Sequence, residues 1–473
     1  MRPVALLHLL SALVGALLAA ACLFATVAAV DIPVTTPTDL IDLNGDCSLR
    51  EAIEAANTDS AVDGCPAGAG ADVILIPTGT ITLSISPVLT DTNAAGDLDL
   101  LTEMTLQGVD ARTTVIDGAG LNRILHISTT ATVTVADLTL TNGRAPDGID
   151  SHDDDILPGK GEDGGAILNE GHLRLYRVTV SASEAGNGGS RGFLPFPTQL
   201  IAGAPGRGGG IYNSGMFTVS QSAIISNSAG SSGSVYALHF FQGTTGGDGG
   251  GIYNVGTLAI DNSTIAKNRT PDGSDVRAPF YYSVVPGNGG DGGGIANVGS
   301  VILDNVSLLA NTTGRGGIAA AEIYTRTGGD GVGGGILSFM IDEVKARNSV
   351  LAGNRTAATA NDCVGNLLSL GFNLIETTAG CTITGTVDSN VYGVSSGLGP
   401  LGLYRGTTPV YYAPYTGPAV DRGDCIDSHG TAVSVDQEGT ARPQLAGCDI
   451  GASEAYVPDY LQFLPYIGDL ADD

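Results

Sequence analysis

The residues best equipped for chemistry lie in one acidic stretch of the chain. Asp150, Ser151, His152, Asp153, Asp154 and Asp155 follow one another, and Glu162 and Asp163 come shortly afterwards. Carboxylates bind calcium or work in pairs in glycoside hydrolysis, and histidine transfers protons near neutral pH. His152, Asp153, Asp154 and Asp155 are therefore the candidate catalytic residues. The sequence favours a plainer interpretation, a solvated acidic loop, because catalytic groups need rigid support.

A second set of carboxylates recurs along the chain, close to runs of glycine. The set consists of Asp163, Asp248, Asp291 and Asp330, and Arg207 interrupts it. Carboxylates aligned along one edge could bind calcium, the one cofactor that the sequence suggests. The favoured interpretation is again structural, because aspartate readily caps turns. Calcium-binding nonapeptide repeats would also need a nine-residue period, which this chain lacks.

The glycine runs belong to a hexad that occurs five times. Its copies are Gly164–Asn169, Gly208–Asn213, Gly249–Asn254, Gly292–Asn297 and Gly333–Ser338. The last residues of successive copies lie 44, 41, 43 and 41 positions apart. A fixed period of this length is typical of a solenoid, a propeller or an array.

Short apolar runs separated by turn residues fill the chain from residue 71 to residue 360, without helical periodicity. This pattern predicts an all-β fold in which short parallel strands form a coil, a parallel β-helix. Because about 20 residues suffice for one coil of three short strands, we expect each repeat of about 42 residues to contain two coils, one of them extended by an insertion.

Two sets of asparagines recur in phase with the hexads. They are Asn169, Asn213, Asn254 and Asn297 within the hexads, and Asn227, Asn268, Asn311 and Asn354 after them. We expect their side-chain amides to form hydrogen-bonded ladders along the stack. Glycine-rich insertions of about 20 residues precede the hexads and should leave the helix on one side. If the protein binds a partner, this shared surface is the expected place.

Composition and cysteine spacing restrict the environment of the protein. The apolar N-terminus, residues 1–29, reads as a secretory signal. Six cysteines follow it in three local couples, which predicts the disulfides Cys47–Cys65, Cys363–Cys381 and Cys425–Cys448. The net charge of −28 disfavours nucleic acid as a partner. We expect a monomer that meets a membrane only through its signal or an anchor.

Three motifs resemble known families of exported bacterial proteins. Cys47 to Ala52 reads Cys-Ser-Leu-Arg-Glu-Ala, which resembles the CSLREA domain, and Ser48 and Glu51 have the spacing of a helix capping box. We expect residues 30–70 to form an N-terminal cap with one short helix. The hexads are similar to the repeats of polymorphic outer membrane proteins. We expect residues 361–455 to form the final coils and a C-terminal closing region, in which Val435–Pro443 and Cys448–Glu454 resemble the end of a choice-of-anchor Q region. A short tail, 456–473, follows.

These resemblances imply a right-handed parallel β-helix of the pectin-lyase-like kind, secreted or held at the cell surface or outer envelope. The expected function is surface display or adhesion without catalysis, with an extracellular carbohydrate or surface protein as partner. The alternative is a polysaccharide-active enzyme on the same fold, either a pectate-lyase-like lyase or a glycoside hydrolase. Fold alone does not choose between these two functions.

Overall fold

The computed structural model describes residues 29–86, 93–152, 156–194, 202–237, 241–277, 284–321, 324–339 and 344–455. The expected signal, apart from Ala29, and the tail 456–473 lie outside these ranges. Within them, no helix combines the length and the apolarity needed to cross a membrane.

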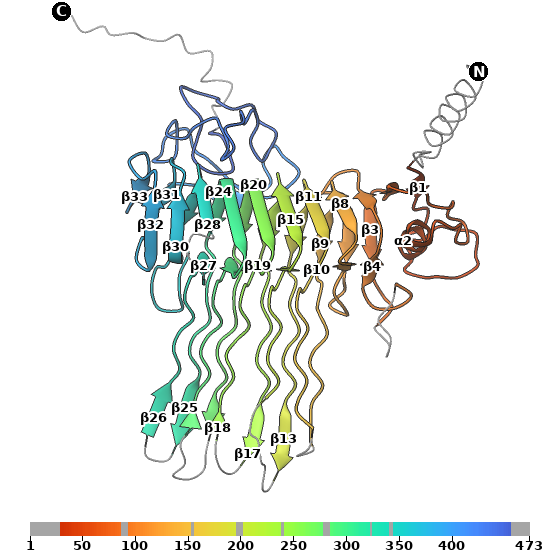
Figure 1. The fold of residues 1–473 in the computed structure, drawn as a ribbon, viewed down its shortest axis with the longest axis horizontal. Coiled ribbons are helices and arrows are strands. Elements are labelled where there is room, and N and C mark those ends of the chain that lie inside the picture. Colours follow the sequence, from red (N-terminus) through yellow and green to blue (C-terminus); the bar gives the residue numbers. More distant parts are fainter. Residues whose placement is uncertain are drawn as a thin grey trace, which may run out of the picture.

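The described strands form a right-handed parallel β-helix, which confirms the predicted fold class. One 26-stranded sheet winds along the long axis of the molecule, and successive coils pair in parallel (Figure 1). Each complete coil has three strands and therefore three faces. Inward side chains of each strand alternate with outward ones, which gives one continuous apolar core.

The first face carries the hexads. Its strands are β4 (Leu98–Leu100), β7 (Leu125–Ile127), β10 (Ile167–Asn169), β14 (Ile211–Asn213), β19 (Ile252–Asn254), β23 (Ile295–Asn297) and β27 (Ile336–Ser338). The isoleucine that opens each of the last five strands is at most 2% exposed, so these side chains stack inside the helix.

The second and third faces meet at a corner. The second holds β1 (Asp31–Pro33), β2 (Asp72–Leu75), β5 (Met104–Gln107), β8 (Thr132–Ala136), β11 (His172–Tyr176), β15 (Met216–Ser220), β28 (Val344–Arg347), β30 (Cys363–Ser369) and β32 (Cys381–Gly385). The third holds β3 (Gly79–Thr82), β6 (Thr114–Asp117), β9 (Thr139–Thr141), β12 (Thr179–Ser181), β16 (Ala223–Ile225), β29 (Val350–Ala352), β31 (Leu374–Ile375) and β33 (Val391–Tyr392). β20 (Thr257–Ala266) and β24 (Ser300–Leu309) run through the corner and contribute to both faces.

The expectation of two coils per repeat is wrong. Ile211 pairs directly with Ile252, and Ile252 pairs with Ile295, so one repeat advances the helix by a single coil. At the strand spacing of about 4.8 Å the helix is half as long as two coils per repeat would require. The insertion explains the error, because it has the length of a coil but does not wind around the core.

The two asparagine rows form hydrogen-bonded ladders. Asn169 donates to Asn213 at 2.6 Å, Asn213 to Asn254 at 2.6 Å and Asn254 to Asn297 at 2.7 Å. The second row runs from Asn227 through Asn268 and Asn311 to Asn354, with Nδ2–Oδ1 distances of 2.9–3.0 Å. This row ends on Asp362, whose Oδ1 accepts from Asn354 at 2.9 Å.

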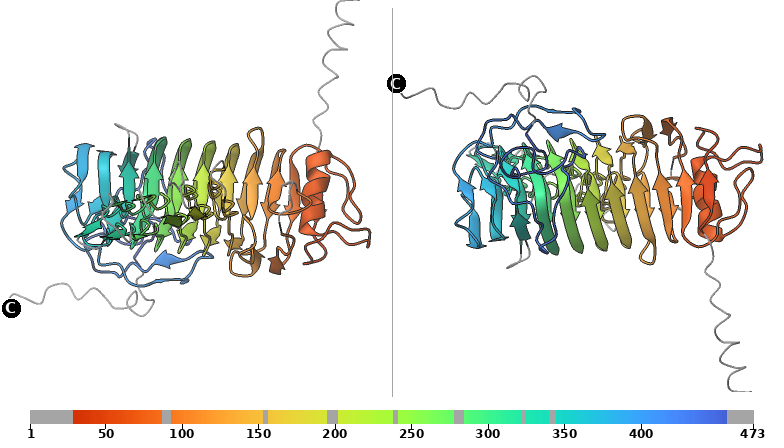
Figure 2. Two further views of the ribbon diagram at one scale, coloured as in Figure 1. Left: turned by 90° about the horizontal axis from the view of Figure 1, so that it is seen from below. Right: turned by 90° about the horizontal axis from the view of Figure 1, so that it is seen from above.

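Helix α2 (Leu49–Thr58) covers the N-terminal end of the stack (Figure 2). Ser48 and Glu51 form the capping box that starts it. The arginine of the motif, Arg50, is fully buried, pairs with Asp39 at 2.8 Å and donates to the carbonyl groups of residues 93, 96 and 97. The cap is continuous with the helix, since β1 pairs with β2.

Three disulfides join cysteines that are consecutive in the sequence. They connect Cys47 with Cys65 in the cap, Cys363 with Cys381 in the last coils and Cys425 with Cys448 in the C-terminal region.

The C-terminal region, residues 396–455 with β34 (Leu401–Gly402) and β35 (Val410–Tyr411), lies along the outside of the helix (Figure 1). It reaches back as far as Gln221, whose Nε2 donates to the carbonyl of Asp436 at 2.9 Å.

The insertions form an ordered projection on the opposite side of the helix, which we call the flange (Figure 1). Outgoing segments (residues 143–151, 183–191, 227–235, 268–277 and 311–321) face returning segments (156–164, 202–208, 241–249, 284–292 and 324–333). Its strands are β13 (Arg191–Leu194), β17 (Val235–Ala237), β18 (Phe241–Gln242), β21 (Val276–Arg277), β22 (Val284–Val285), β25 (Ile318–Ala321) and β26 (Tyr324–Thr327).

Backbone hydrogen bonds connect the outgoing and returning segments of the flange in a zigzag. Gly186 donates to Glu162, Gly206 to Gly186, Gly230 to Gly206 and Gly247 to Gly230, at 2.8–3.0 Å. Many of the contacting glycines are three residues apart, as in a polyproline II helix, which has three residues per turn. The flange is therefore a lattice of closely packed backbones, and only glycine lets these backbones approach.

Two glycines of one returning segment test this lattice. A Cβ on Gly331 would lie 1.9 Å from the carbonyl oxygen of Gly290, whereas a Cβ on Gly329 would have its nearest neighbour at 3.5 Å. We expect Gly331→Ala to lower the free energy of unfolding by about 1–3 kcal/mol, because backbone must move to relieve the clash. Urea denaturation followed by circular dichroism measures the change. Gly329→Ala is the control, and equal effects of the two variants would contradict the lattice.

Candidate functional site

The predicted catalytic cluster lies in the first insertion. His152 is exposed at the end of the outgoing segment, and Asp153, Asp154 and Asp155 lie outside the described residues. Two neighbouring carboxylates are engaged in structural contacts. Asp150 accepts the backbone N–H of Ser190 at 2.6 Å, and Glu162 accepts the buried Arg123 guanidinium at 2.7 Å. The described part of this cluster thus contributes to the packing of the first flange segment.

The aspartates of the second set divide into two groups. Asp163, Asp248 and Asp291 occupy one row, each directly before a glycine with positive φ (Gly164, Gly249 and Gly292). Asp163 accepts the backbone N–H of Arg207 at 2.7 Å, Asp248 that of Asp291 at 3.0 Å and Asp291 that of Val332 at 2.7 Å. The row therefore bonds each coil to the next at the root of the flange.

Asp330 does not belong to this row. Val332 occupies the row position before Gly333, and Asp330 instead accepts the N–H of Gly316 in an outgoing segment at 2.9 Å. Asp330 lies three positions before the first residue of its hexad, whereas the three row aspartates lie one position before theirs. This shift of two residues places Asp330 outside the row.

A pocket of about 600 Å³ nevertheless brings Asp248, Asp291 and Asp330 together. It lies where the returning segments meet the first face, and we call it the root pocket. Its other lining residues are Arg207, Thr245, Tyr253, Asn288, Gly289, Val298, Gly329, Val332 and Phe339. The volume is within the usual range for small-molecule sites.

One wall of the root pocket is an aromatic stack with a cation on it. The rings of Tyr212 and Tyr253 are stacked, with centroids 5.5 Å apart. The Arg207 guanidinium lies 4.9 Å from the centre of the Tyr253 ring and donates to the Tyr253 hydroxyl at 3.1 Å. Its Nε is 3.7 Å from Asp248, so the charge of Arg207 is largely used within the wall.

The opposite side of the root pocket is apolar. Phe339 follows Val255 and Val298 in one row of turn residues, and each of these donates its N–H to the hexad asparagine of the preceding coil. Phe339 is 51% exposed, and Val332 beside the pocket is 39% exposed. Exposed apolar side chains next to fixed polar groups are typical of binding surfaces.

Burial shifts the acidity of the two row carboxylates in the root pocket. Desolvation raises the pKa of Asp291 to about 6, against a smaller opposing effect of the Val332 N–H, and nearby Asp248 raises it slightly further. Desolvation also raises the pKa of Asp248, which the Asp291 N–H and Arg207 partly offset. Asp291 is thus partly protonated near pH 6.

Calcium at this row stays a prediction. Among the described residues, no group of three or more His, Cys, Asp and Glu side chains converges in a geometry that could hold a metal ion. One oxygen of each row carboxylate is already bonded to a backbone N–H, which leaves at most the other oxygen for a ligand.

Comparisons with known proteins add little to this geometry. No family model and no curated protein matches the chain. One solved structure, "Crystal structure of pectate lyase Pel9A", aligns with 91% of this chain and 98% of its own length, at 12% identity and a TM-score of 0.28. A similarity this low supports no argument about function. The protein is a parallel β-helix by its own strand pairing, and the CSLREA and choice-of-anchor Q resemblances stay predictions.

The sequence indicated part of the root pocket and concealed the rest. Asp248 and Asp291 belong to a series of aspartates that recurs with the repeat, and Arg207 occupies the equivalent position before Gly208, where the series lacks an aspartate. Phe339 and Tyr253 carried no such signal. Phe339 directly follows the altered fifth hexad, whose last residue is serine, and that departure marks the place in the repeat where the pocket opens.

The raised pKa of Asp291 predicts a pH-dependent effect on stability. A raised pKa favours the fold when Asp291 is protonated, and this contribution is lost as the pH rises through about 6. Asp291→Asn keeps an acceptor for the Val332 N–H and cannot ionise. We expect it to be more stable than wild type by about 1 kcal/mol at pH 7.5, after allowance for solvent screening, and equally stable at about pH 3, below the ordinary pKa of 3.8, where Asp291 is protonated in the folded and the unfolded chain. Thermal unfolding at both pH values measures the difference.

Asp272→Asn provides the matched control. Asp272 also accepts a backbone N–H, from Arg315 at 2.7 Å, but is exposed on the flange. It should show no gain at pH 7.5. A gain for Asp291→Asn that persists undiminished at about pH 3 would mean that burial of the charge is not its cause.

Proposed function

We propose that this chain is an exported cell-surface or secreted protein that binds an extracellular carbohydrate without cleaving it, in display or adhesion. Three disulfides support the assignment to an oxidising compartment, where such bonds form and persist. The ordered flange supports a role in presentation, since it projects a rigid surface from the helix (Figure 1).

The root pocket carries the proposal of carbohydrate binding. Sugars present apolar C–H faces together with hydroxyl groups, and they suit sites that combine exposed rings with fixed hydrogen-bonding groups. Phe339 supplies an exposed ring, and the carboxylates of Asp248 and Asp291 supply acceptors that the flange holds in place. Asn288 is fixed as well, because its Oδ1 accepts the N–H of Gly329 at 2.9 Å.

The state of Arg207 supports binding rather than elimination chemistry. An arginine that removes a proton from a substrate must face the substrate and lose its own proton. Arg207 is instead bonded to the Tyr253 hydroxyl and lies beside Asp248, so its guanidinium is engaged within the wall of the pocket. A lyase mechanism through this side chain is therefore disfavoured.

Hydrolysis is the second candidate function, and one observation favours it. Asp291, with a pKa of about 6, could act as a general acid beside a second carboxylate, that of Asp248. This alternative and the main proposal share the root pocket. They differ in whether product appears.

Binding and cleavage assays on the full chain separate these functions. We would run the protein in affinity gels containing neutral or acidic extracellular polysaccharides, with calcium and with chelator. Parallel samples would be followed for unsaturated products by absorbance and for new reducing ends. Retention without either product is the expected outcome. Reducing ends that disappear in Asp291→Asn would replace the proposal with hydrolysis, and retention by none of the polysaccharides would refute it.

Phe339 and Val255 give a matched pair of variants for binding. Phe339→Ala should weaken retention by roughly 5-fold, the effect of losing one ring contact. Val255→Ala removes an apolar side chain that is 41% exposed in the same row of turns but outside the root pocket. It should bind as wild type does. Equal binding by both variants would place the carbohydrate elsewhere.

A further inference from the structure

A second cavity lies on the other side of the molecule, where the C-terminal region crosses the helix corner. Four corner residues, one on each successive coil, form a row under this region. They are Gln221, Asn262, Asn305 and Asn348, with φ values of 48°, 42°, 55° and 51°. Each directly follows a residue that pairs in register with a neighbouring coil. Asparagine tolerates this left-handed conformation better than most residues.

The C-terminal region is fixed to both ends of this row. Gln221 donates to the carbonyl of Asp436 at one end. At the other end, Asn348 accepts the N–H of Asp424 at 2.9 Å and donates to the carbonyl of Asp449 at 3.0 Å. Ser428 adds a contact between them, with its N–H and hydroxyl both donated to Asp304. Residues 427–436 form an arch over the middle of the row.

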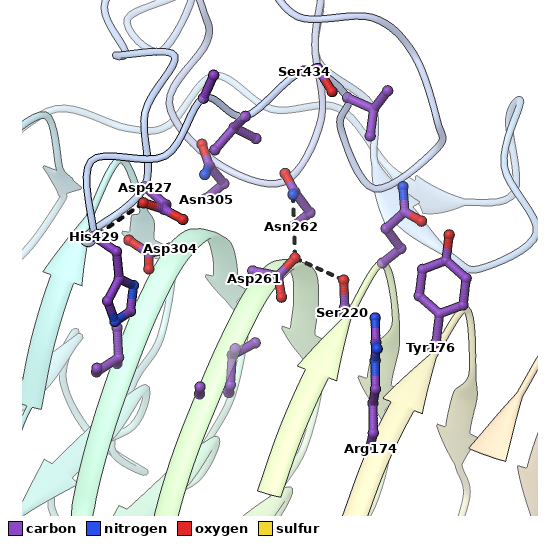
Figure 3. A pocket seen from close by; sticks show the side chains of 17 residues that line it. Arg174, Tyr176, Ser220, Asp261, Asn262, Asp304, Asn305, Asp427, His429 and Ser434 are labelled. Atoms are coloured by element: carbon purple, nitrogen blue, oxygen red, sulfur yellow. Dashed lines mark hydrogen bonds between the residues drawn. The ribbon is translucent and has the colours of Figure 1, made fainter. Parts of the chain in front are cut away.

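The two corner residues under the arch have polar atoms without partners. Asn262 is 7% exposed and Asn305 is fully buried, yet within the described residues Asn262 Oδ1 and Asn305 Nδ2 make no hydrogen bond. Both side chains line a cavity of about 490 Å³ between the arch and the strands (Figure 3). Buried amides without partners are costly, so these atoms indicate that something polar occupies the cavity.

The groups around these amides define the chemistry of the occupant. Asp261 adds an acceptor beside Asn262, with one oxygen bonded to Ser220 at 2.8 Å (Figure 3). Asn305 provides a donor, and Ile302 and Val433 provide apolar surface. Hydroxyl groups satisfy such a mixture, because each of them both donates and accepts.

Charge disfavours an anionic occupant. Three carboxylates, those of Asp261, Asp304 and Asp427, line the cavity together with two basic side chains, Arg174 and His429. Asp304 accepts hydrogen bonds from Ser428, and Asp427 accepts those of the His429 and Thr431 N–H groups, so neutral donors stabilise both carboxylates. A carboxylate or phosphate would face this negative group, whereas an uncharged ligand would not.

We propose that the cavity under the arch binds one uncharged sugar residue, either a free sugar or the terminal unit of a glycan. Its hydroxyls satisfy Asn262 Oδ1, Asn305 Nδ2 and Asp261, and its C–H face lies on Ile302 and Val433. The cavity is separate from the root pocket, so this assignment does not depend on the function proposed for that pocket.

Saturation-transfer NMR with the full chain tests the assignment. The probes are glucose, galactose, mannose and N-acetylglucosamine, with galacturonate as the anionic counterpart. Disaccharides that end in the same neutral sugars distinguish a terminal unit from a free sugar. We expect at least one neutral sugar to bind with a dissociation constant on the order of millimolar, and galacturonate to bind more weakly.

Variants locate the binding. Asp261→Asn keeps an acceptor for Ser220 and replaces the other oxygen with a donor, and we expect at least a 5-fold loss of affinity. Asn305→Asp keeps the oxygen that accepts from Asn348, removes the free donor, and should give a similar loss. Asp272→Asn on the flange removes a charge far from the arch and should change nothing. Circular dichroism verifies that each variant is folded.

Three results would overturn the assignment. One is binding of galacturonate in preference to every neutral sugar. Another is neutral-sugar binding that Asp261→Asn and Asn305→Asp leave intact. The third is a crystal soaked with the neutral sugars in which only ordered water contacts Asn262 and Asn305. Loss of sugar binding in Phe339→Ala, without loss in Asp261→Asn, would place the sugar in the root pocket.

Discussion

The coil-to-coil hydrogen bond at the strand spacing of about 4.8 Å is the constraint on which this structure depends. It fixes the register of the hexads, and from that register follow the stacked isoleucines and both asparagine ladders. It also governs the flange, where aspartates accept the N–H groups of the next coil. Much of the acidity of the chain thus has a structural use on coil edges that would otherwise lack acceptors.

In the flange, contacts between backbones take the place of contacts between side chains. Its glycines bring outgoing and returning segments into direct contact, so no apolar core is needed to order them. The root pocket forms where this lattice meets the strands of the first face. There side chains line the surface again, among them the buried Tyr253 and the exposed Phe339.

The sequence predicted the β-helix because its period and its inward isoleucines are local and repeated. It failed on the number of coils per repeat, because length alone does not distinguish a coil from an excursion of equal length. It also concealed the corner row. Gln221 and Asp436 are 215 residues apart, and no local pattern indicates that they meet. The unpartnered amides of Asn262 and Asn305 become meaningful only once the arch above them is known.

The strap formed by the C-terminal region changes how the solenoid can come apart. Repeat proteins ordinarily lose their terminal units one at a time, since each unit contacts only its neighbours. Here bonds from Asp436 to Gln221 and from Asp449 to Asn348 join units that are three coils apart. A force that pulls on the last coils would therefore act on all the coils from Gln221 to Asn348 at once. This end of the protein should resist force as one mechanical block.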